Sequence, residues 1–157
     1  MDLDITVSVP AESDIASILE IELDSQPEPW TEKSFLEEIE RASLFVARAA
    51  VADSSACAFS GDIVGYICFW SVGDEVQILN VAVRKPMRRQ GIARKLIEFA
   101  IRTGRNRRAR IATLEVRESN TAARRLYESL GFRITGERPG YYGMQNESAI
   151  LMELDIS

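Results

Sequence analysis

The chain has 157 residues, of which 46% are hydrophobic and 27% charged, ordinary proportions for a soluble globular protein. A chain of this length can bury a sizeable core, and we expect residues 1–157 to form one domain. The net charge of −5 argues against direct binding of nucleic acid and favours a cationic partner. The chain has no histidine, which excludes Ser-His-Asp and Cys-His catalysis. Any catalysis must therefore use carboxylates, tyrosine, lysine or backbone groups.

The features that report on location point to the cytoplasm. Cys57 and Cys68 fit neither a metal-binding spacing nor a disulfide framework. The longest apolar stretch, residues 63–70, is far shorter than the ~20 residues that a membrane-spanning helix needs. The amino terminus begins with acidic residues and lacks the positively charged region of a signal peptide. We expect a cytoplasmic protein that holds no metal and contacts no membrane.

The first third of the chain predicts a strand followed by two helices. Apolar residues alternate with polar ones at positions 5–9, which indicates a strand with one buried face. Ser13 is placed to cap a helix that must end before the prolines of residues 27–29. Thr31 is placed to cap a second helix, whose inward face carries Phe35 and its apolar neighbours.

The middle of the chain predicts strands that pair in the antiparallel sense. Residues 44–51 and 63–72 are rich in strand-forming residues, and a loop of small residues over 53–61 connects them. The dipeptide Gly73-Asp74 is typical of a tight turn, so a further strand over 76–83 is expected to turn back on its predecessor.

The last third predicts the remaining helices and strands. Helices are expected over 91–102 and 121–130, the second closed by Gly131, and strands over 111–116, 132–136 and 149–156, the last two around a loop rich in glycine, proline and tyrosine. Because a helix separates strand 76–83 from strand 111–116, these two strands should be parallel. The predicted fold class is α+β: a single mixed domain with a mostly antiparallel central sheet, one parallel strand pair and flanking helices.

A candidate anion site lies where strand 76–83 gives way to the following helix. Gly91 lets the backbone approach a ligand closely, and the first turn of a helix presents unpaired N–H groups and the positive end of the dipole. Arg88 and Arg89 add positive charge beside it. This combination is typical of a phosphate cradle. Most strand-to-helix turns bind nothing, however, and a run of arginines is as often a solvated helix face.

The pattern Arg88-x-x-Gly91-x-Ala93 resembles the pyrophosphate loop of the GNAT acetyltransferases. Further blocks are similar to the bacterial RimI-type ribosomal-protein-alanine N-acetyltransferases, and together they cover nearly the whole chain. These blocks are Pro29-Trp30-Thr31, residues 79–83, residues 114–120, residues 122–132 and Arg138-Pro139-Gly140-Tyr141-Tyr142.

This resemblance implies an acetyl-CoA site and an acceptor site. The implied contacts to acetyl-CoA, a co-substrate that needs no metal, come from the backbone and side chains of Val81, Val83, Arg88, Arg89, Gln90, Gly91, Ile92, Ala93, Arg94 and Asn120. The backbone of strand 76–83 would form hydrogen bonds with the pantetheine arm, and one of its N–H groups would polarise the thioester carbonyl, as an oxyanion hole does. The implied acceptor contacts come from Trp30, Tyr141 and Tyr142.

The resemblance also implies that Glu115 is the base for the incoming amine, through a water molecule. Glu115 points away from the face shared by Leu114 and Val116, and it lies at the carboxyl end of a predicted parallel strand, where ligands of such sheets collect. The alternative is a surface glutamate paired with a neighbour such as Arg117.

Tyr127 is the implied acid that protonates the departing thiolate. A phenol with pKa ≈ 10 can give a proton to a thiolate whose conjugate acid has pKa ≈ 8.5 at modest cost. Tyr127 follows Asn120 by seven residues, which would place both on one face of the same helix. The alternative is a tyrosine that only packs in the core.

The expected acceptor is the N-terminal α-amino group of a basic protein, in particular the N-terminal alanine of a small-subunit ribosomal protein, as the resemblance implies. An α-amino group has pKa ≈ 7.7–8.0, against ≈ 10.4 for lysine, so it needs only mild help from a glutamate. Three alternatives remain open at this point. The chain could acetylate a small amine such as a polyamine or amino sugar, act as a non-catalytic acyl-CoA-binding module, or contact RNA through the arginines of residues 102–110, which the net charge discourages.

Overall fold

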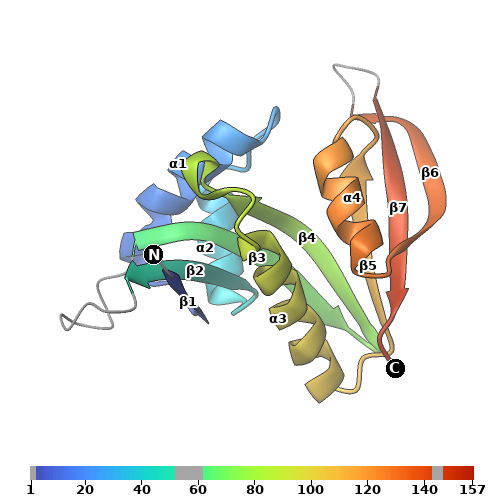
Figure 1. Cartoon of the computed structure of the whole chain (residues 1–157), viewed down its shortest axis with the longest axis horizontal. Helices are drawn as coiled ribbons and strands as arrows, with labels where there is room; N and C mark the ends of the chain where they lie inside the picture. Colours follow the sequence, from blue (N-terminus) through green and yellow to red (C-terminus); the bar gives the residue numbers. More distant parts are fainter. Residues whose placement is uncertain (1–2, 52–61, 143–146) are drawn as a thin grey trace. The chain divides into compact units, whose positions relative to one another are not determined.

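A computed structural model describes residues 3–51, 62–142 and 147–157. The predicted loop over 53–61, with Cys57, lies outside them. The described elements follow the predicted order (Figure 1): β1 Leu3–Ser8, a 3-10 turn at Glu12–Asp14, α1 Ile15–Ser25, α2 Glu32–Glu40, β2 Leu44–Val51, β3 Asp62–Val72, β4 Glu75–Val83, a 3-10 turn at Lys85–Met87, α3 Ile92–Asn106, β5 Ile111–Arg117, α4 Thr121–Ser129, β6 Arg133–Tyr142 and β7 Glu147–Asp155.

The strands of the described residues form a mixed sheet in the order β1-β2-β3-β4-β5-β7-β6. Strands β4 and β5 are parallel, with Glu75 opposite Ile111 and Ile78 opposite Leu114. The pairs β1–β2, β2–β3, β5–β7 and β6–β7 are antiparallel. The predicted fold class, a mostly antiparallel sheet with one parallel pair and flanking helices, is confirmed.

Two compact units divide the chain, and each is described by itself. The first comprises Met1–Phe69 and Asn80–Phe99, and the second comprises Trp70–Leu79 and Ala100–Ser157. The expectation that residues 1–157 form one domain stays a prediction.

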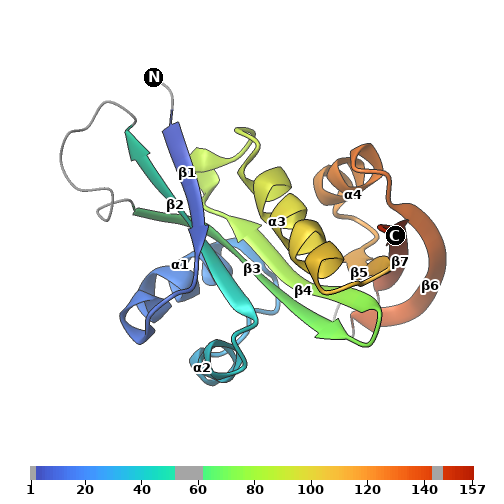
Figure 2. The ribbon, with the colours of Figure 1, turned by 90° about the horizontal axis from the view of Figure 1, so that it is seen from below.

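In the first unit, helices cover both faces of the strands (Figure 2). On one face, Ile18 of α1, Phe35 of α2 and Tyr66 of β3 are fully buried in one hydrophobic core. On the other face, Phe45 of β2 packs against Phe99 of α3, with ring centroids 4.9 Å apart. Successive strand residues point to opposite faces, so both faces of these strands must be apolar, and each helix supplies one apolar stripe to cover them.

In the second unit, α4 lies against β5 and β7 (Figure 1). Tyr127 of α4 is buried and meets Phe132 edge to face, with ring centroids 5.9 Å apart. The last turn of α3 approaches its neighbours closely, because a Cβ added at Gly104 would lie 2.2 Å from the Val76 side chain. Glycine at this position is therefore a packing requirement.

Four predicted details are wrong. Ser13 lies within the 3-10 turn and caps nothing; α1 begins at Ile15, and the Asp14 carboxylate accepts from the Ala11 N–H at 2.8 Å. Val9 lies beyond the end of β1 and is exposed. Helix α3 continues to Asn106, one turn beyond the predicted end. Residues 137–142, predicted as loop, belong to β6, because backbone pairing with β7 tolerates their glycine and proline at the edge of the sheet.

Candidate active site

The predicted phosphate cradle has the backbone that its sequence requires. Arg89 and Gly91 both adopt left-handed backbone, with φ of 65° and 77°, and α3 begins at the next residue. The Gly91 carbonyl accepts from the Lys95 N–H at 3.1 Å, the first hydrogen bond of the helix. The amide groups of Ile92, Ala93 and Arg94 precede this bond, so they have no acceptor within the helix. The amide groups of Ile92 and Ala93 lie at the positive end of the α3 dipole, where an anion binds favourably.

The two arginines of the cradle differ in their contacts. Arg88 donates to the Val83 carbonyl at 3.0 Å and to the Ser25 hydroxyl at 3.1 Å. It therefore braces the loop against β4 and the end of α1. Arg89 and Gln90 are exposed. Arg94 pairs with Glu98 one turn along the helix.

A buried carboxylate that the sequence analysis missed lies beside β4. Glu22 of α1 is fully buried, and both its oxygens accept hydrogen bonds. One oxygen accepts from the Tyr66 hydroxyl, and both accept from the Asn80 side-chain amide, at 3.2 and 3.1 Å. The second oxygen also accepts from the Trp30 backbone N–H at 2.9 Å. Burial raises the pKa of Tyr66, and the neighbouring Glu22 carboxylate adds to this effect.

The Glu22 cluster fixes the path of the segment between α1 and α2. Gln26 donates to the Asn80 side-chain oxygen at 3.1 Å, so both ends of residues 26–30 are tied to β4 through Glu22 and Asn80. Trp30, a predicted acceptor residue, is half-buried, and its ring lies 5.4 Å from that of Phe35. In the sequence, Glu22 gave only a weak signal: it is a charged residue inside the apolar stripe of a helix.

Glu115 occupies the predicted place in the second unit. It lies near the carboxyl end of β5 and faces away from Leu114 and Val116, which are both buried. One Glu115 oxygen pairs with Arg138 of β6 at 3.1 Å, and the glutamate side chain is 30% exposed. Arg117, the partner weighed in the sequence analysis, instead pairs with Glu147 at 3.3 Å.

Asn120 lies just before α4, and Tyr127 lies near the end of the same helix. The Asn120 side-chain oxygen accepts from the Ala123 N–H at 3.2 Å, so Asn120 is the N-cap of α4. The sequence analysis, which placed Asn120 within the helix, is wrong on this point. The cap uses the oxygen and leaves the side-chain NH₂ as a donor for a ligand. Tyr127 is 6% exposed, so its ring belongs to the core whatever else its hydroxyl does.

The remaining predicted residues are described in part. Val83 is buried and Val81 half-buried in β4; their contacts to a pantetheine arm stay a prediction. Tyr141 and Tyr142 lie in β6, and their side chains fall outside the described residues.

Comparison with known proteins places the chain in a family. Residues 15–132 match the acetyltransferase (GNAT) family. The chain belongs to the GNAT family of acetyltransferases. It is an acetyl-CoA-dependent N-acetyltransferase, as the motifs around Gly91 predicted.

Curated relatives and solved structures of this GNAT enzyme cover nearly its full length. The ribosomal protein bS18-alanine N-acetyltransferases of Salmonella typhimurium and Escherichia coli K12 are each 34% identical to it, over 97% of this chain and 98% of the relative. The crystal structure of the ribosomal-protein-S18-alanine N-acetyltransferase from Escherichia coli is similar, with a TM-score of 0.82, 32% identity, and coverage of 98% of this chain and 95% of that one. Ard1 from Thermoplasma volcanium has a TM-score of 0.85 at 27% identity, covering 98% of each chain.

The cradle of this GNAT enzyme fits the pyrophosphate of acetyl-CoA. Apart from its two chain neighbours, no protein atom lies within 4 Å of a Cβ built at Gly91, so the backbone there faces open space beside the first turn of α3. A branched side chain at this position would fill the space that a phosphate needs.

No helix within the described residues is long and apolar enough to span a bilayer.

Proposed function

We propose that this enzyme transfers an acetyl group from acetyl-CoA to the N-terminal α-amino group of a ribosomal protein, with alanine as the first residue. The proposal rests on the relatives named as ribosomal protein bS18-alanine N-acetyltransferases, which are 34% identical over nearly the full chain. The net charge of −5 is consistent with a basic acceptor, because opposite charges speed the encounter.

The reaction needs a base, an acid and a polarised carbonyl. Acetyl-CoA supplies an activated acetyl thioester. In our proposal, the amide groups of residues 90–94 hold its pyrophosphate, Asn120 donates to the pantetheine, and a backbone N–H of β4 polarises the carbonyl. Glu115 takes the proton from the attacking amine through a water molecule, and Tyr127 gives a proton to the sulfur. The amine nitrogen forms the new bond to the acetyl carbon as the carbon–sulfur bond breaks.

The observation that supports the base most directly is the placement of Glu115. It is a partly exposed carboxylate near the carboxyl end of a parallel strand, and its Oε1 forms an ion pair with a guanidinium nitrogen of Arg138 at 3.1 Å. This pairing orients the carboxylate and leaves its second oxygen as an acceptor for water. Arg138 is thus a positioning residue for the base.

The test is the substitution Glu115→Gln, followed by release of the CoA thiol with peptides and small amines as acceptors. Removal of a general base typically costs ~10²–10⁴-fold in rate. The deficit should shrink above about pH 8, because the α-amino group is then already neutral. Glu128→Gln is the matched control: it removes an exposed carboxylate of α4 in the same unit and should leave the rate unchanged.

Two outcomes would contradict the proposal separately. A Glu115→Gln rate within twofold of wild type at every pH would assign this glutamate to structure. A polyamine or an internal lysine that outperforms every peptide beginning with alanine would remove the proposed acceptor and leave the acetyltransferase.

A further inference from the structure

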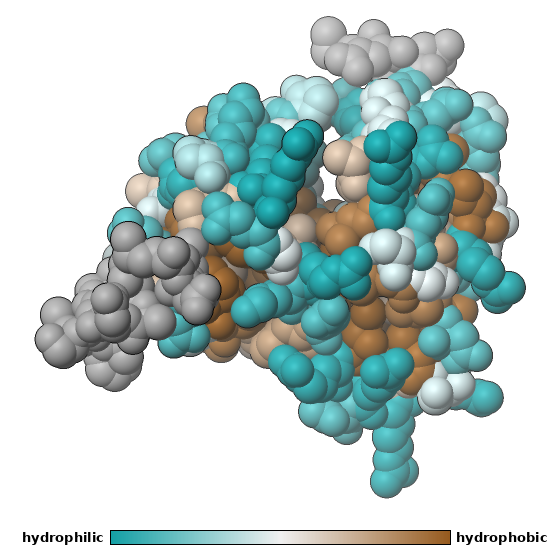
Figure 3. Space-filling model, in the orientation of Figure 1, coloured by the Kyte–Doolittle hydropathy of each residue, from teal (hydrophilic) through white to brown (hydrophobic). Residues whose placement is uncertain are grey.

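The second unit carries a concentration of positive charge that acetyl transfer does not use. Its six exposed arginines, the arginine patch, are Arg102, Arg105, Arg107, Arg108, Arg110 and Arg133. Hydrophilic side chains gather over this end of α3, at the bottom of the view in Figure 3. Within the described part of the chain, none of the six forms an ion pair, whereas Arg84, Arg117 and Arg138 each pair with a carboxylate.

The acids beside the patch are too few to balance it. Arg110 and Arg133 both lie close enough to Asp155 to help hold the pKa of that carboxyl below its usual range, although its hydrogen bonds from Ser157 have the larger effect. Three further acids lie near the patch. Asp74 accepts from the Arg110 N–H through its backbone carbonyl at 2.6 Å, Glu75 stands opposite Ile111, and Glu153 stands opposite Arg133. Six arginines against these four carboxylates still leave a local excess of positive charge.

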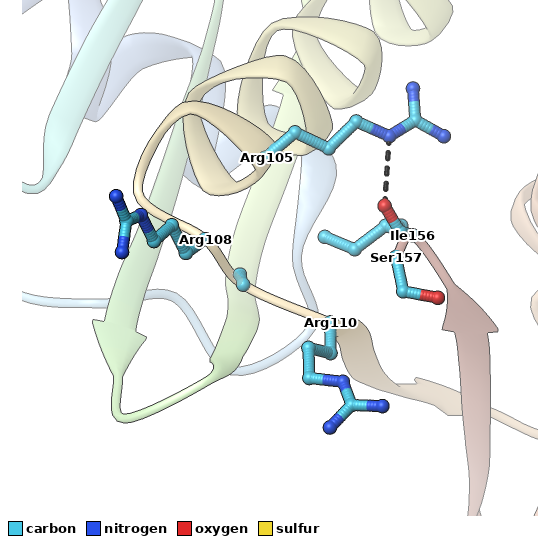
Figure 4. A pocket seen from close by; sticks show the side chains of 6 residues that line it. Arg105, Arg108, Arg110, Ile156 and Ser157 are labelled. Atoms are coloured by element: carbon cyan, nitrogen blue, oxygen red, sulfur yellow. Dashed lines mark hydrogen bonds between the residues drawn. The ribbon is translucent and has the colours of Figure 1, made fainter.

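Three of the arginines line a pocket of about 430 Å³ together with Ile156 and Ser157. Arg105 donates through Nε to the Ile156 carbonyl at 3.0 Å, which holds its stem while its terminal nitrogens stay available. Figure 4 shows that the guanidinium groups of Arg105, Arg108 and Arg110 point in different directions. They do not converge on one point, so they suit an extended anion with many charges better than a single small one.

Arg108 occupies a backbone position at which glycine is the usual residue. Arg108 lies two residues beyond the end of α3 and has left-handed backbone, with φ of 64°, and the Ala109 N–H donates to the Gly104 carbonyl at 2.9 Å. This arrangement closes many helices, and glycine is the residue that adopts it without strain. An arginine here is less favourable for the backbone than glycine, and its side chain lines the pocket with Arg105 and Arg110.

A purely structural explanation accounts for only part of the patch. Positive side chains near a helix C-terminus interact favourably with the helix dipole, which suffices for Arg102 and Arg105. The effect falls off within the last turn of the helix, so it does not explain Arg110 or Arg133, which lie beside and on the strands.

We propose that the arginine patch binds the phosphate backbone of RNA. The planar fork of arginine matches phosphate oxygens with two hydrogen bonds, and all six cations are arginines. The segment over residues 102–110 exposes no apolar side chain, so it lacks the groups with which surface helices enter a lipid bilayer.

The net charge of −5, which argued against nucleic acid, does not decide the matter. At physiological ionic strength the Debye length is ≈ 8 Å, so acids further from the patch than this are largely screened and the local excess determines binding.

The patch is separate from the catalytic residue of the same unit. Arg110 precedes β5, and Glu115 lies near the other end of this strand, about 16 Å from Arg110 at the usual rise of a strand. The patch and the proposed base therefore do not overlap. If the proposed function holds, RNA binding brings the enzyme to a ribosomal protein in the company of RNA; the binding itself does not depend on that function.

The test uses the full chain and a fluorescently labelled 20-nucleotide single-stranded RNA, followed by anisotropy. We expect a Kd between about 10⁻⁶ and 10⁻⁴ M near physiological salt. Each phosphate contact should contribute about −0.7 to the slope of log K against log salt. If Arg108→Gly removes one such contact, it should weaken RNA binding roughly 8-fold at 50 mM salt. The triple variant, which combines Arg108→Gly with Arg105→Gln and Arg110→Gln, should weaken RNA binding by more than a hundredfold.

The variants are chosen so that unfolding cannot imitate the result. Arg108→Gly suits the left-handed backbone, so its melting temperature should not fall below that of wild type. Arg41→Gln, which removes an arginine of the first unit paired with Glu38, should leave RNA binding unchanged. Acetylation of a free peptide should be unaffected in the triple variant.

Wild-type affinity in the triple variant would overturn the proposal. So would stronger binding to oligoglutamate or to anionic vesicles than to RNA, or equal competition by a mononucleotide. Loss of peptide acetylation in all forms, with RNA binding intact, would instead defeat the proposed function alone.

Discussion

Replacement of Glu22 should destabilise the first unit in a graded way. Glu22 is fully buried and accepts hydrogen bonds from three donors: the Tyr66 hydroxyl, the Asn80 side-chain amide and the Trp30 N–H. Glu22→Ala leaves these donors without an acceptor, at roughly 1–3 kcal/mol each. Even at the low end, the free energy of unfolding should fall by ~3 kcal/mol. For a chain of this size that corresponds to a melting temperature lower by roughly 6–12 °C.

Glu22→Gln keeps the shape of the side chain and should cost less. The Gln oxygen can still accept from Trp30 and Asn80, while its NH₂ faces the Tyr66 hydroxyl, which can rotate to accept. Only the contribution of the charge is lost, about 1–2 kcal/mol. We also expect both variants to raise the KM for the acceptor peptide more than that for acetyl-CoA, because Glu22 fixes the backbone of Trp30.

Thermal melts and steady-state kinetics on the two variants test this reasoning. Glu20→Ala is the matched control, because Glu20 lies on the same helix and forms an exposed ion pair with Arg84, which is worth at most about 1 kcal/mol. If Glu22→Ala melts within 2 °C of this control, or if the alanine and glutamine variants are indistinguishable, the cluster does not hold the segment as described.

Three further predictions concern the cradle, the acid and a buried thiol. Gly91→Val places a branched side chain in left-handed backbone where phosphate must approach, so acetyl-CoA binding measured by calorimetry should be lost while the fold persists; normal binding would mean that the loop has another role. Tyr127→Phe keeps the ring of a buried side chain and removes the hydroxyl, so turnover should fall strongly at nearly unchanged acetyl-CoA affinity; full turnover with a lower melting temperature would assign Tyr127 to the core alone. Burial raises the pKa of the Cys68 thiol to about 12, and the Glu38 carboxylate adds to the effect. The folded state thus favours the protonated thiol. The stabilisation that the thiol contributes to the free energy of unfolding is complete below about pH 8.5 and is lost as pH rises towards 12, by up to about 1.4 kcal/mol per pH unit. Cys68→Ala should flatten this dependence of the free energy of unfolding on pH, measured by urea unfolding, and an unchanged dependence would contradict the assignment.

Local patterns in the sequence predicted most of the fold and pointed to the loop at Gly91 as the candidate cofactor loop. The Thr31 cap is confirmed, with its hydroxyl accepting from the Ser34 N–H at 3.2 Å, because capping involves residues only three apart. Gly91 was also singled out from a local signal, because a residue without a Cβ lets the backbone approach a ligand; its left-handed backbone was not predicted. The parallel pairing of β4 with β5 also followed from the order of elements along the chain, since a helix between two strands allows that connection.

Contacts between distant residues were decided only by the tertiary structure. Glu22 meets Tyr66 and Asn80 across sequence separations of 44 and 58 residues, and no pattern around any of the three predicts the others. Glu115 pairs with Arg138 instead of the nearer Arg117 because β6 brings Arg138 to the same place, whereas Arg117 is taken by Glu147. The energy of a buried charge depends on which donors surround it in space, and the one-dimensional order of residues does not specify them.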